Sequence, residues 1–181
     1  MTVYVGLLRA VNLGRGTQVR MEDLRALLSR MGFAGVQSLL QSGNVVFETD
    51  DRNERALEKR IEDRIARELG LRTDFFVRTG KEWSAIVQGN PFLQEAKAAP
   101  GFLVVTVLKE TPLEEGWRDL DRAISGRERV RGGGRHAYIV YPDGQGRSRL
   151  TPALIEKHLK TRGTNRNWNT VTKLAALSSA P

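Results

Sequence analysis

The sequence contains no cysteine, and this absence excludes several kinds of chemistry at once. Disulfide bonds, catalytic thiolates and zinc sites built on sulfur all need that residue. Histidine is also scarce, because only His136 and His158 occur, and neither has a second histidine or a carboxylate at a metal-ligand spacing. His136 falls in a strand pattern, and His158 falls late in a predicted helix, where an imidazolium suits the helix dipole. We therefore predict no metal site and no catalytic histidine.

Long apolar runs are missing as well. No stretch approaches the ~18 apolar residues of a membrane span. The first residues, MTVYVGLLRAVNLGRG, lack the basic segment, apolar run and cleavage site of a secretory signal. The composition is 40% hydrophobic and 28% charged, with both signs represented, which is typical of a folded globular protein. We expect a cytoplasmic protein with no membrane partner.

Familiar catalytic motifs are absent too. No serine stands in G-x-S-x-G, because Ser42 is preceded by Leu40 and Gln41. The glycine loop RAVNLGRG, residues 9–16, has the setting of a phosphate loop, but it matches neither G-x-x-x-x-G-K-[ST] nor G-x-G-x-x-G. Asn12 and Arg15 of this loop are candidate ligand contacts, and the alternative is a turn that needs glycine and asparagine. We predict no catalytic residue and no cofactor, and whether the protein is an enzyme stays open.

The positive charge is unevenly distributed along the chain. The formal net charge is +8, and residues 127–173 hold eleven basic and three acidic residues, whereas the remainder holds 18 of each. Concentrated positive charge attracts nucleic-acid backbone, phosphorylated metabolites or acidic lipid. Because 22 of the 29 basic residues are arginine, an arginine-rich composition without a binding role is the alternative. The candidate polyanion-binding residues are Arg127, Arg129, Arg131, Arg135, Arg147 and Arg149.

Two similar series of elements are predicted from periodicity and turn residues. The first series is βαββαβ, the ferredoxin-like or split βαβ arrangement. It comprises a strand over 3–11, a helix over 20–31 ending at Gly32, a hairpin of 36–41 and 44–49, a helix over 52–69 ending at Gly70, and a strand over 72–79. Positive φ in the hairpin turn is expected at Gly43 and Asn44.

The second series is βαββα. It comprises a strand over 102–108, a helix over 113–124, paired strands over 127–131 and 136–141, and a helix over 151–159 capped by Thr151 with Pro152 at its first position. The spacing of Thr79, Trp83 and Ile86 recurs in Thr164, Trp168 and Val171. We predict an α+β protein made by tandem duplication of ferredoxin-like units, with antiparallel sheets and helices on one face. The expected division is 1–87 for the first unit, 88–100 for a linker, and 101–181 for the second unit with a C-terminal helix.

Two polar motifs could contribute to a ligand site. QSGN, residues 41–44, is predicted to be a hairpin turn, and Ser42 and Asn44 matter only if they converge with other polar groups. In TNRNWNTV, residues 164–171, Thr164 or Asn165 is predicted to cap a helix whose Trp168 closes the second core. The remaining residues of that motif, Arg166, Asn167 and Asn169, would place polar groups at the positive end of the helix, where an anion could bind.

Five ordered motifs are similar to a known family. LLRAVNLG, RMEDLRALLSRMGF, LLQSGNVVF, YPDGQGRSRLT and TNRNWNTVTKL resemble bacterial proteins grouped as domain of unknown function 1697, over about Tyr4 to Leu174. The family commonly reads T-T-R-N-W-N-T in the last motif, so Asn165 replaces a threonine within the predicted cap. The resemblance implies a cytoplasmic bacterial protein with a duplicated α+β fold, and it implies no activity.

Three classes of function remain. The leading hypothesis is a binding protein for a polyanion, nucleic acid foremost, or for a phosphorylated ligand, through the basic second half. The first alternative is an enzyme for a small phosphorylated or nucleotide-like substrate, in which Asn12, Asn44, Arg166 and Asn169 converge. The second is a protein-interaction or regulatory module. A sheet-face RNA site is weakly supported, because Tyr138 and Tyr141 are three residues apart and at most one could stack on a base. The oligomeric state is not predicted.

Overall fold

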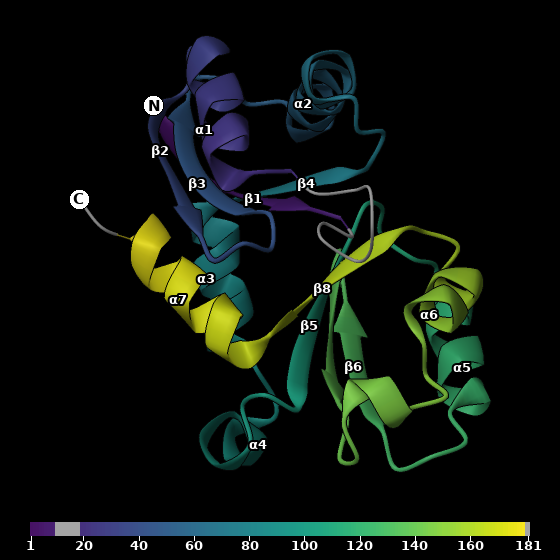
Figure 1. Cartoon of the computed structure of the whole chain (residues 1–181). Helices are drawn as coiled ribbons and strands as arrows, with labels where there is room; N and C mark the ends of the chain where they lie inside the picture. The colour runs from purple at the N-terminus through teal and green to yellow at the C-terminus, as the bar shows by residue number, and fades with distance from the viewer. Residues whose placement is uncertain (10–18, 180–181) are drawn as a thin grey trace. The chain divides into compact units, whose positions relative to one another are not determined.

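The computed structural model describes residues 1–9 and 19–179. The glycine loop that carries Asn12 and Arg15 lies outside the described residues. The chain divides into a first unit, Met1–Ala85 with Lys173–Pro181, and a second unit, Ile86–Thr172. Each unit contains one four-stranded antiparallel sheet with helices, so the α+β class is confirmed (Figure 1). The contacts group residues 173–181 with the first unit, whereas the sequence-based boundaries place them in the second.

The first unit has the strand order β2-β3-β1-β4, with every neighbouring pair antiparallel. Side chains of α1 and α2, such as Leu24, Leu28, Ile61 and Ile65, form its core with Phe47 of the sheet. Its elements are β1 (Thr2–Leu8), α1 (Met21–Arg30), β2 (Ala34–Leu39), β3 (Asn44–Thr49), α2 (Glu54–Leu69), β4 (Phe75–Thr79) and α3 (Gly80–Gln88). Both helices therefore cover one face of the sheet.

The helix ends predicted in this unit are confirmed. Gly32 has a φ of 87° just after α1, and Gly70 has a φ of 67° at the end of α2. Both angles lie in the left-handed region that glycine adopts without strain. In the hairpin turn, the positive φ predicted for Gly43 is confirmed (72°), whereas the one predicted for Asn44 is wrong, because Asn44 is the first residue of β3 and Leu40 instead has a φ of 61°.

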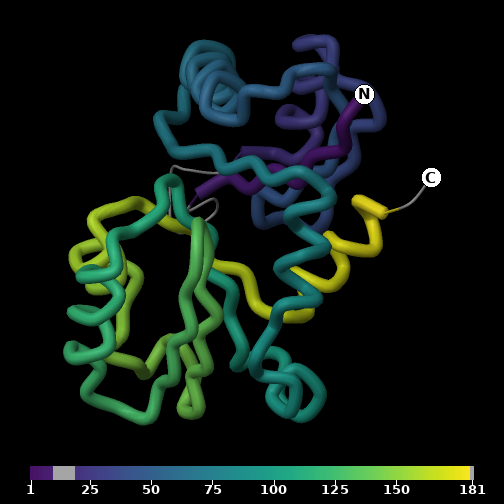
Figure 2. The backbone as a smooth tube through the Cα atoms, turned by 180° about the vertical axis from the view of Figure 1, so that it is seen from behind, coloured from purple at the N-terminus to yellow at the C-terminus, as the bar shows by residue number. Residues whose placement is uncertain are grey.

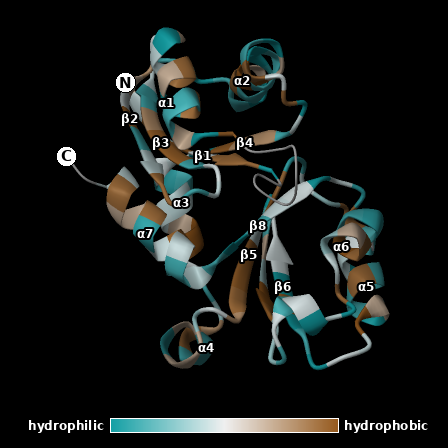
Figure 3. Ribbon diagram, viewed as in Figure 1, coloured by the Kyte–Doolittle hydropathy of each residue, from teal (hydrophilic) through white to brown (hydrophobic). Residues whose placement is uncertain are grey.

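The second unit has the strand order β6-β7-β5-β8, again antiparallel throughout. Leu120 of α5 and Ile155 and Leu159 of α6 pack with Val104 and Ile139 of the sheet. Its elements are α4 (Leu93–Ala98), β5 (Leu103–Leu108), α5 (Glu114–Ala123), β6 (Arg129–Gly133), β7 (His136–Val140), η1 (Gln145–Arg147), α6 (Pro152–Leu159), β8 (Gly163–Asn167) and the start of α7 (Trp168–Ser178). Figure 2 shows the β6–β7 hairpin from behind, and the brown colour of β5 in Figure 3 marks its apolar sequence.

Two segments differ from the sequence-based expectation. The expected linker contains the short helix α4. The motif GTNRN forms strand β8 rather than a helix start, so Thr164 and Asn165 do not cap a helix. The cap of α7 is Asn167, whose Oδ1 accepts a hydrogen bond from Thr170 N (3.0 Å). The Thr151 cap of α6 is confirmed, because its side chain accepts from Leu154 N (3.2 Å).

The two sheets share a register as well as a strand order. Val5 of β1 pairs with Arg78 of β4, and Val105 of β5 pairs with Arg166 of β8. Each arginine is the next-to-last residue of its strand, directly before the strand residue that caps the following helix, Thr79 or Asn167. Arg78 and Arg166 therefore occupy corresponding positions in the two units.

This correspondence shows that the residue echo noted in the sequence is wrong. Thr79 is the last residue of β4, and its counterpart at the end of β8 is Asn167 rather than Thr164. Trp83 and Trp168 consequently stand at different places in α3 and α7, although both are buried. The two units share the order and register of their strands, and the spaced threonine and tryptophan pairs do not follow that register.

Candidate functional site

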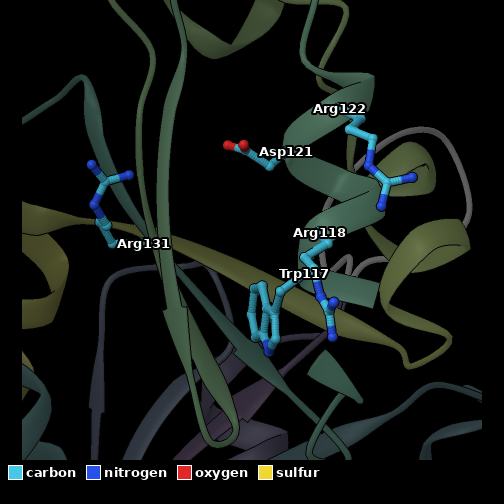
Figure 4. Close-up of a pocket in the computed structure, with 5 residues that line it drawn as sticks. All are labelled: Trp117, Arg118, Asp121, Arg122 and Arg131. Carbon is cyan, nitrogen blue, oxygen red and sulfur yellow. The ribbon is translucent and has the colours of Figure 1, made fainter. Parts of the chain in front are cut away.

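A pocket of about 410 Å³ opens at the surface of the second unit beside α5 and β6. Its size falls within the range of roughly 300–1,000 Å³ that is usual for small-molecule sites. It is shown in Figure 4, and its lining residues are Trp117, Arg118, Asp121, Arg122 and Arg131. Three of the five are arginines, so the pocket is basic and carries one aromatic ring. None of these residues except Arg131 was predicted as a site residue from the sequence.

The spacing of residues along α5 determines which of its side chains line the pocket. Trp117 and Asp121 are one helical turn apart, and both project from α5 toward the strands, as Figure 4 shows. Arg118 and Arg122 form a second such pair, whose guanidinium groups lie on the other side of the helix in that view. Arg131 comes from β6, and its side chain projects away from α5. The indole and the carboxylate therefore lie on the side of α5 that faces the strands, and the guanidinium groups of Arg118 and Arg122, here called the rim arginines, lie on the other side of the helix.

A glycine on the facing strand allows the tryptophan to approach. A Cβ atom on Gly132 of β6 would overlap the six-membered ring of Trp117. The indole thus lies directly against the backbone of β6, and it also packs against the hydrophobic core of the unit. Behind it, a Cβ on Gly116 would come within 2.9 Å of His158 O in α6. Two glycines therefore determine how closely the tryptophan-bearing turn of α5 approaches its neighbours.

The predicted polyanion-binding arginines fall into different surroundings. Arg127 forms an ion pair with Asp143, which raises the pKa of its guanidinium. Arg129 forms an ion pair with Glu95, lowers the pKa of that carboxyl, and lies 5.1 Å from the ring centroid of Phe92. Arg131 Nη1 donates to Val130 O (2.8 Å). Arg127 and Arg129 are therefore partly neutralised.

The remaining three differ in exposure. Arg135 is partly buried at the turn between β6 and β7. Arg147 of η1 and Arg149 just after it are exposed, and neither has an ion pair with a described residue. Arg147 and Arg149 are accordingly the two most available of the predicted cations.

The motif TNRNWNT carries one partly buried cation and two asparagines at the start of a helix. Arg166 Nη1 donates to Thr164 Oγ1 and to Asn165 O, both at 2.8 Å, and burial lowers the pKa of its guanidinium to about 10. Asn167 caps α7, and Asn169 is exposed in the first turn. The expectation that Arg166 stands at a helix terminus is wrong, because it lies within β8.

The residues predicted from QSGN lie in the first unit. Asn44 is fully buried, and its Nδ2 donates to Leu39 O (3.1 Å) and to Ser42 Oγ (2.7 Å). These bonds close the hairpin and account for the asparagine structurally. Arg166 and Asn169 belong to the second unit, and Asn12 lies outside the described residues. The convergence of these residues in one enzyme site therefore stays a prediction.

The two candidate stacking tyrosines are buried. Tyr138 OH donates to Ile86 O (2.6 Å), and Tyr141 OH donates to Leu150 O (3.2 Å). Burial raises the pKa of Tyr138 to about 12, and it also raises the pKa of Tyr141. Neither ring is free to stack on a base, so the sheet face of this unit lacks the aromatic platform of a common RNA-binding module.

Comparison with known proteins identifies the family. A family model described as protein of unknown function (DUF1697) matches residues 1–138. The chain belongs to this family. The DUF1697 protein is also similar in structure to the conserved bacterial protein SP0830 from Streptococcus pneumoniae, with a TM-score of 0.77 and 19% identity over 98% of this chain and 99% of that chain. At this identity the likeness concerns the fold. A search of curated proteins finds no match.

The described residues lack two further features that could indicate a function. No helix among them is long and apolar enough to cross a membrane. No group of three or more histidine, aspartate and glutamate side chains in the described ranges could hold a metal ion. The lining of the pocket in the second unit offers three guanidinium groups, one indole and one carboxylate.

Proposed function

We propose that this DUF1697 protein binds phosphate-bearing ligands, nucleic acid foremost, through the exposed cations of its second unit. The proposal rests on the observation that these cations are exposed and have no carboxylate partner among the described residues. Seven exposed cations of the second unit have no ion pair among the described residues: Lys97, Arg118, Arg131, Arg147, Arg149, Lys157 and Lys160. They belong to α4, α5, β6, η1, α6 and the residues beside these elements. Uncompensated charge of this kind attracts anions and is the electrostatic signature of phosphate binding.

The first unit pairs only part of its surface charge internally. Its exposed arginines Arg20, Arg30 and Arg60 form ion pairs with Glu22, Glu68 and Asp51, whereas Arg52 and Arg72 have no ion pair among the described residues. An arginine-rich composition by itself would give both units similar surfaces. Residues 127–173 hold eleven basic and three acidic residues and lie in the second unit except for Lys173, and this uneven distribution favours a binding role for the second unit over a compositional origin of its charge.

We also propose that the two units are copies of one ferredoxin-like unit and that the protein works in the cytoplasm. The shared strand order, the antiparallel pairing and the equivalent register of Arg78 and Arg166 support the duplication. A cytoplasmic location would give the second unit access to nucleic acids and phosphorylated metabolites. Cell fractionation with an antibody to the protein tests the location directly.

Salt dependence tests the binding proposal. The full-length protein should bind single-stranded RNA or DNA at low salt, with log K falling by about 0.7–0.9 per neutralised phosphate as log salt rises. Reversing Arg131, Arg147 and Arg149 to glutamate should weaken binding and flatten the slope. Arg129 is left intact because Glu95 already neutralises it. Fluorescence anisotropy with a labelled oligonucleotide measures both quantities.

The matched control reverses three exposed cations of the first unit, Arg52, Arg72 and Lys81, and changes the net charge by the same amount. If only the total charge matters, both triple variants should weaken binding equally. We expect the control to keep most of its affinity and slope. Equal losses, or no binding to any RNA or DNA at low salt, would remove nucleic acid from consideration.

A further inference from the structure

We infer that the pocket beside α5 and β6 takes one nucleotide, with its base against the indole of Trp117 and its phosphate among the rim arginines. This inference rests on the proposed function and names the ligand class of its site. A base and a phosphate can come from a free mononucleotide or from a nucleotide of a single strand, and the chemistry recognised is the same.

The position of Trp117 distinguishes it from the other tryptophans. Trp83 is 0% exposed and Trp168 is 8% exposed, whereas Trp117 is partly exposed and lines the pocket. Its ring packs on the backbone of β6 at Gly132, and that contact fixes the plane of the indole. A fixed, partly exposed aromatic ring offers a stacking surface that loses little conformational entropy on binding.

The polar groups of the pocket fit the two ends of a nucleotide. Asp121 projects beside Trp117 toward the strands, where its carboxylate can accept hydrogen bonds from an exocyclic amine or a ribose hydroxyl. Its negative charge disfavours a phosphate at that position. Arg118 and Arg122 stand at the rim, and guanidinium groups bind phosphate oxygens well. Arg122 also forms a 3.4 Å ion pair with Asp119, which orients it. The pocket therefore has a base end and a phosphate end.

Other aromatic rings of the unit are poorer candidates. Tyr138 and Tyr141 are buried with their hydroxyl groups bonded to backbone carbonyls. Phe102 is 48% exposed, but it is absent from the pocket lining. Phe102 thus serves as a matched exposed aromatic against which Trp117 can be compared.

Tryptophan fluorescence of the wild-type protein tests the inference without a destabilising substitution. Acrylamide first establishes which part of the emission is accessible, and we expect this part to arise from Trp117. AMP, UMP and short single strands should then quench it, whereas ribose 5-phosphate should not. Stronger quenching by single strands than by mononucleotides would assign the polymer as the natural source, and the reverse would assign the free nucleotide.

Variants connect the signal to binding. Trp117→Phe should remove the quenching while keeping affinity within a few fold, and Trp117→Ala should weaken binding roughly five- to 150-fold, the effect expected for loss of one base–aromatic stack. Phe102→Ala should bind as the wild type does. Circular dichroism of each variant checks that it is folded. If the Trp117→Ala variant does not fold, the quenching experiment on the wild-type protein still tests the inference.

Two outcomes would overturn the inference and separate it from the proposed function. Binding of oligonucleotides with a normal salt slope but without quenching would retain phosphate binding and exclude the Trp117 stack. Equal affinity for AMP and ribose 5-phosphate would likewise retain phosphate binding and exclude stacking of a base on Trp117. Absence of binding to every phosphate-bearing probe would instead overturn the proposed function itself.

Discussion

Corresponding positions in the strands of the two units have the same backbone pairing but carry side chains of different polarity. In the first unit Gly6 of β1 faces Val77 of β4, and Arg78 follows. In the second unit Thr106 of β5 faces Asn165 of β8, and Arg166 follows. The first pair is small and apolar, and the second is polar. The two sheets therefore share a backbone arrangement that does not depend on the identity of these residues.

The arginines show the contrast most clearly. Arg78 is 3% exposed, and Glu58 of α2 lies 3.9 Å from it while accepting a hydrogen bond from Val77 N (2.8 Å). The contacts described for Arg166 are with a hydroxyl and a carbonyl. Each guanidinium also donates to the carbonyl of the residue before it. A carboxylate thus lies near the buried Arg78, and the described hydrogen bonds of the partly buried Arg166 include a hydroxyl and a carbonyl.

The largest expected effect comes from removing the carboxylate of the first unit. Glu58→Ala should lower the free energy of unfolding by about 3–5 kcal/mol, because Arg78 remains buried after its nearby carboxylate is lost. The loss also removes the acceptor of Val77 N–H. Urea denaturation followed by circular dichroism measures the change. Glu58→Gln keeps that acceptor and should cost less.

A double variant separates charge from packing. Adding Arg78→Met to Glu58→Gln removes the buried cation together with its counter-charge, and much of the stability should return. A double variant less stable than either single one would contradict this account. So would a Glu58→Ala protein within ~0.5 kcal/mol of the wild type, the range of ordinary surface substitutions.

A smaller loss is expected at the corresponding position of the second unit. Arg166→Met keeps the stem and removes, among the contacts of Arg166, the hydrogen bonds to Thr164 and Asn165, each contributing about 0.5–1.5 kcal/mol. Because burial disfavours the charged guanidinium, its removal also relieves part of that cost. We expect a net loss of about 1–2 kcal/mol in urea denaturation. The exposed neighbour Asn169→Ala should stay within about 0.5 kcal/mol.

The Arg166 and Asn169 variants also address the unsolved ligand role of this motif. If both lost several kcal/mol, the motif would be a buried network that serves the fold. If a bound anion raises the melting temperature of the wild type but not of Asn169→Ala, the exposed asparagine contacts that anion. The second result would show that the motif TNRNWNT contributes to anion binding by the second unit.

The smallest expected effect is a gain in stability when Asn165 is replaced by threonine. The Asn165 Oδ1 atom accepts from Thr106 Oγ1 (2.8 Å), but Asn165 Nδ2 is buried with no hydrogen-bond partner among the described residues. Such a group costs roughly 1–3 kcal/mol. Asn165→Thr keeps an acceptor for Thr106 and removes the amide nitrogen. We expect a gain of about 1 kcal/mol in the same denaturation experiment.

Asn165→Val is the matched control, since valine is the residue at the corresponding position of the first unit, Val77. It removes the amide but leaves the Thr106 hydroxyl without its acceptor, so its gain should be smaller. A loss of stability in Asn165→Thr would contradict this account of the unpaired amide.

Local sequence was sufficient for most helices and for the class of the fold. The spacing of Leu24, Leu27 and Leu28, the Gly32 and Gly70 ends, and the Thr151–Pro152 start each act within one turn of backbone. Signals of this kind are readable without tertiary information. The order of elements then indicated two α+β series, and five motifs indicated the family.

Strand β8 and the pocket depended on tertiary structure. GTNRN has no apolar alternation, and it is a strand because its backbone groups pair with β5 over Val104–Leu108. The same pairing moved the helix cap from Thr164 or Asn165 to Asn167 and placed Arg166 inside a sheet. Nothing in the spacing of GWRDLDR or RVRGG indicates that Trp117 meets Gly132, because fifteen residues separate them in the chain. Sequence by itself determined what forms locally, and the tertiary structure decided which polar groups are buried, which are exposed and which share a pocket, because those properties depend on contacts between distant residues.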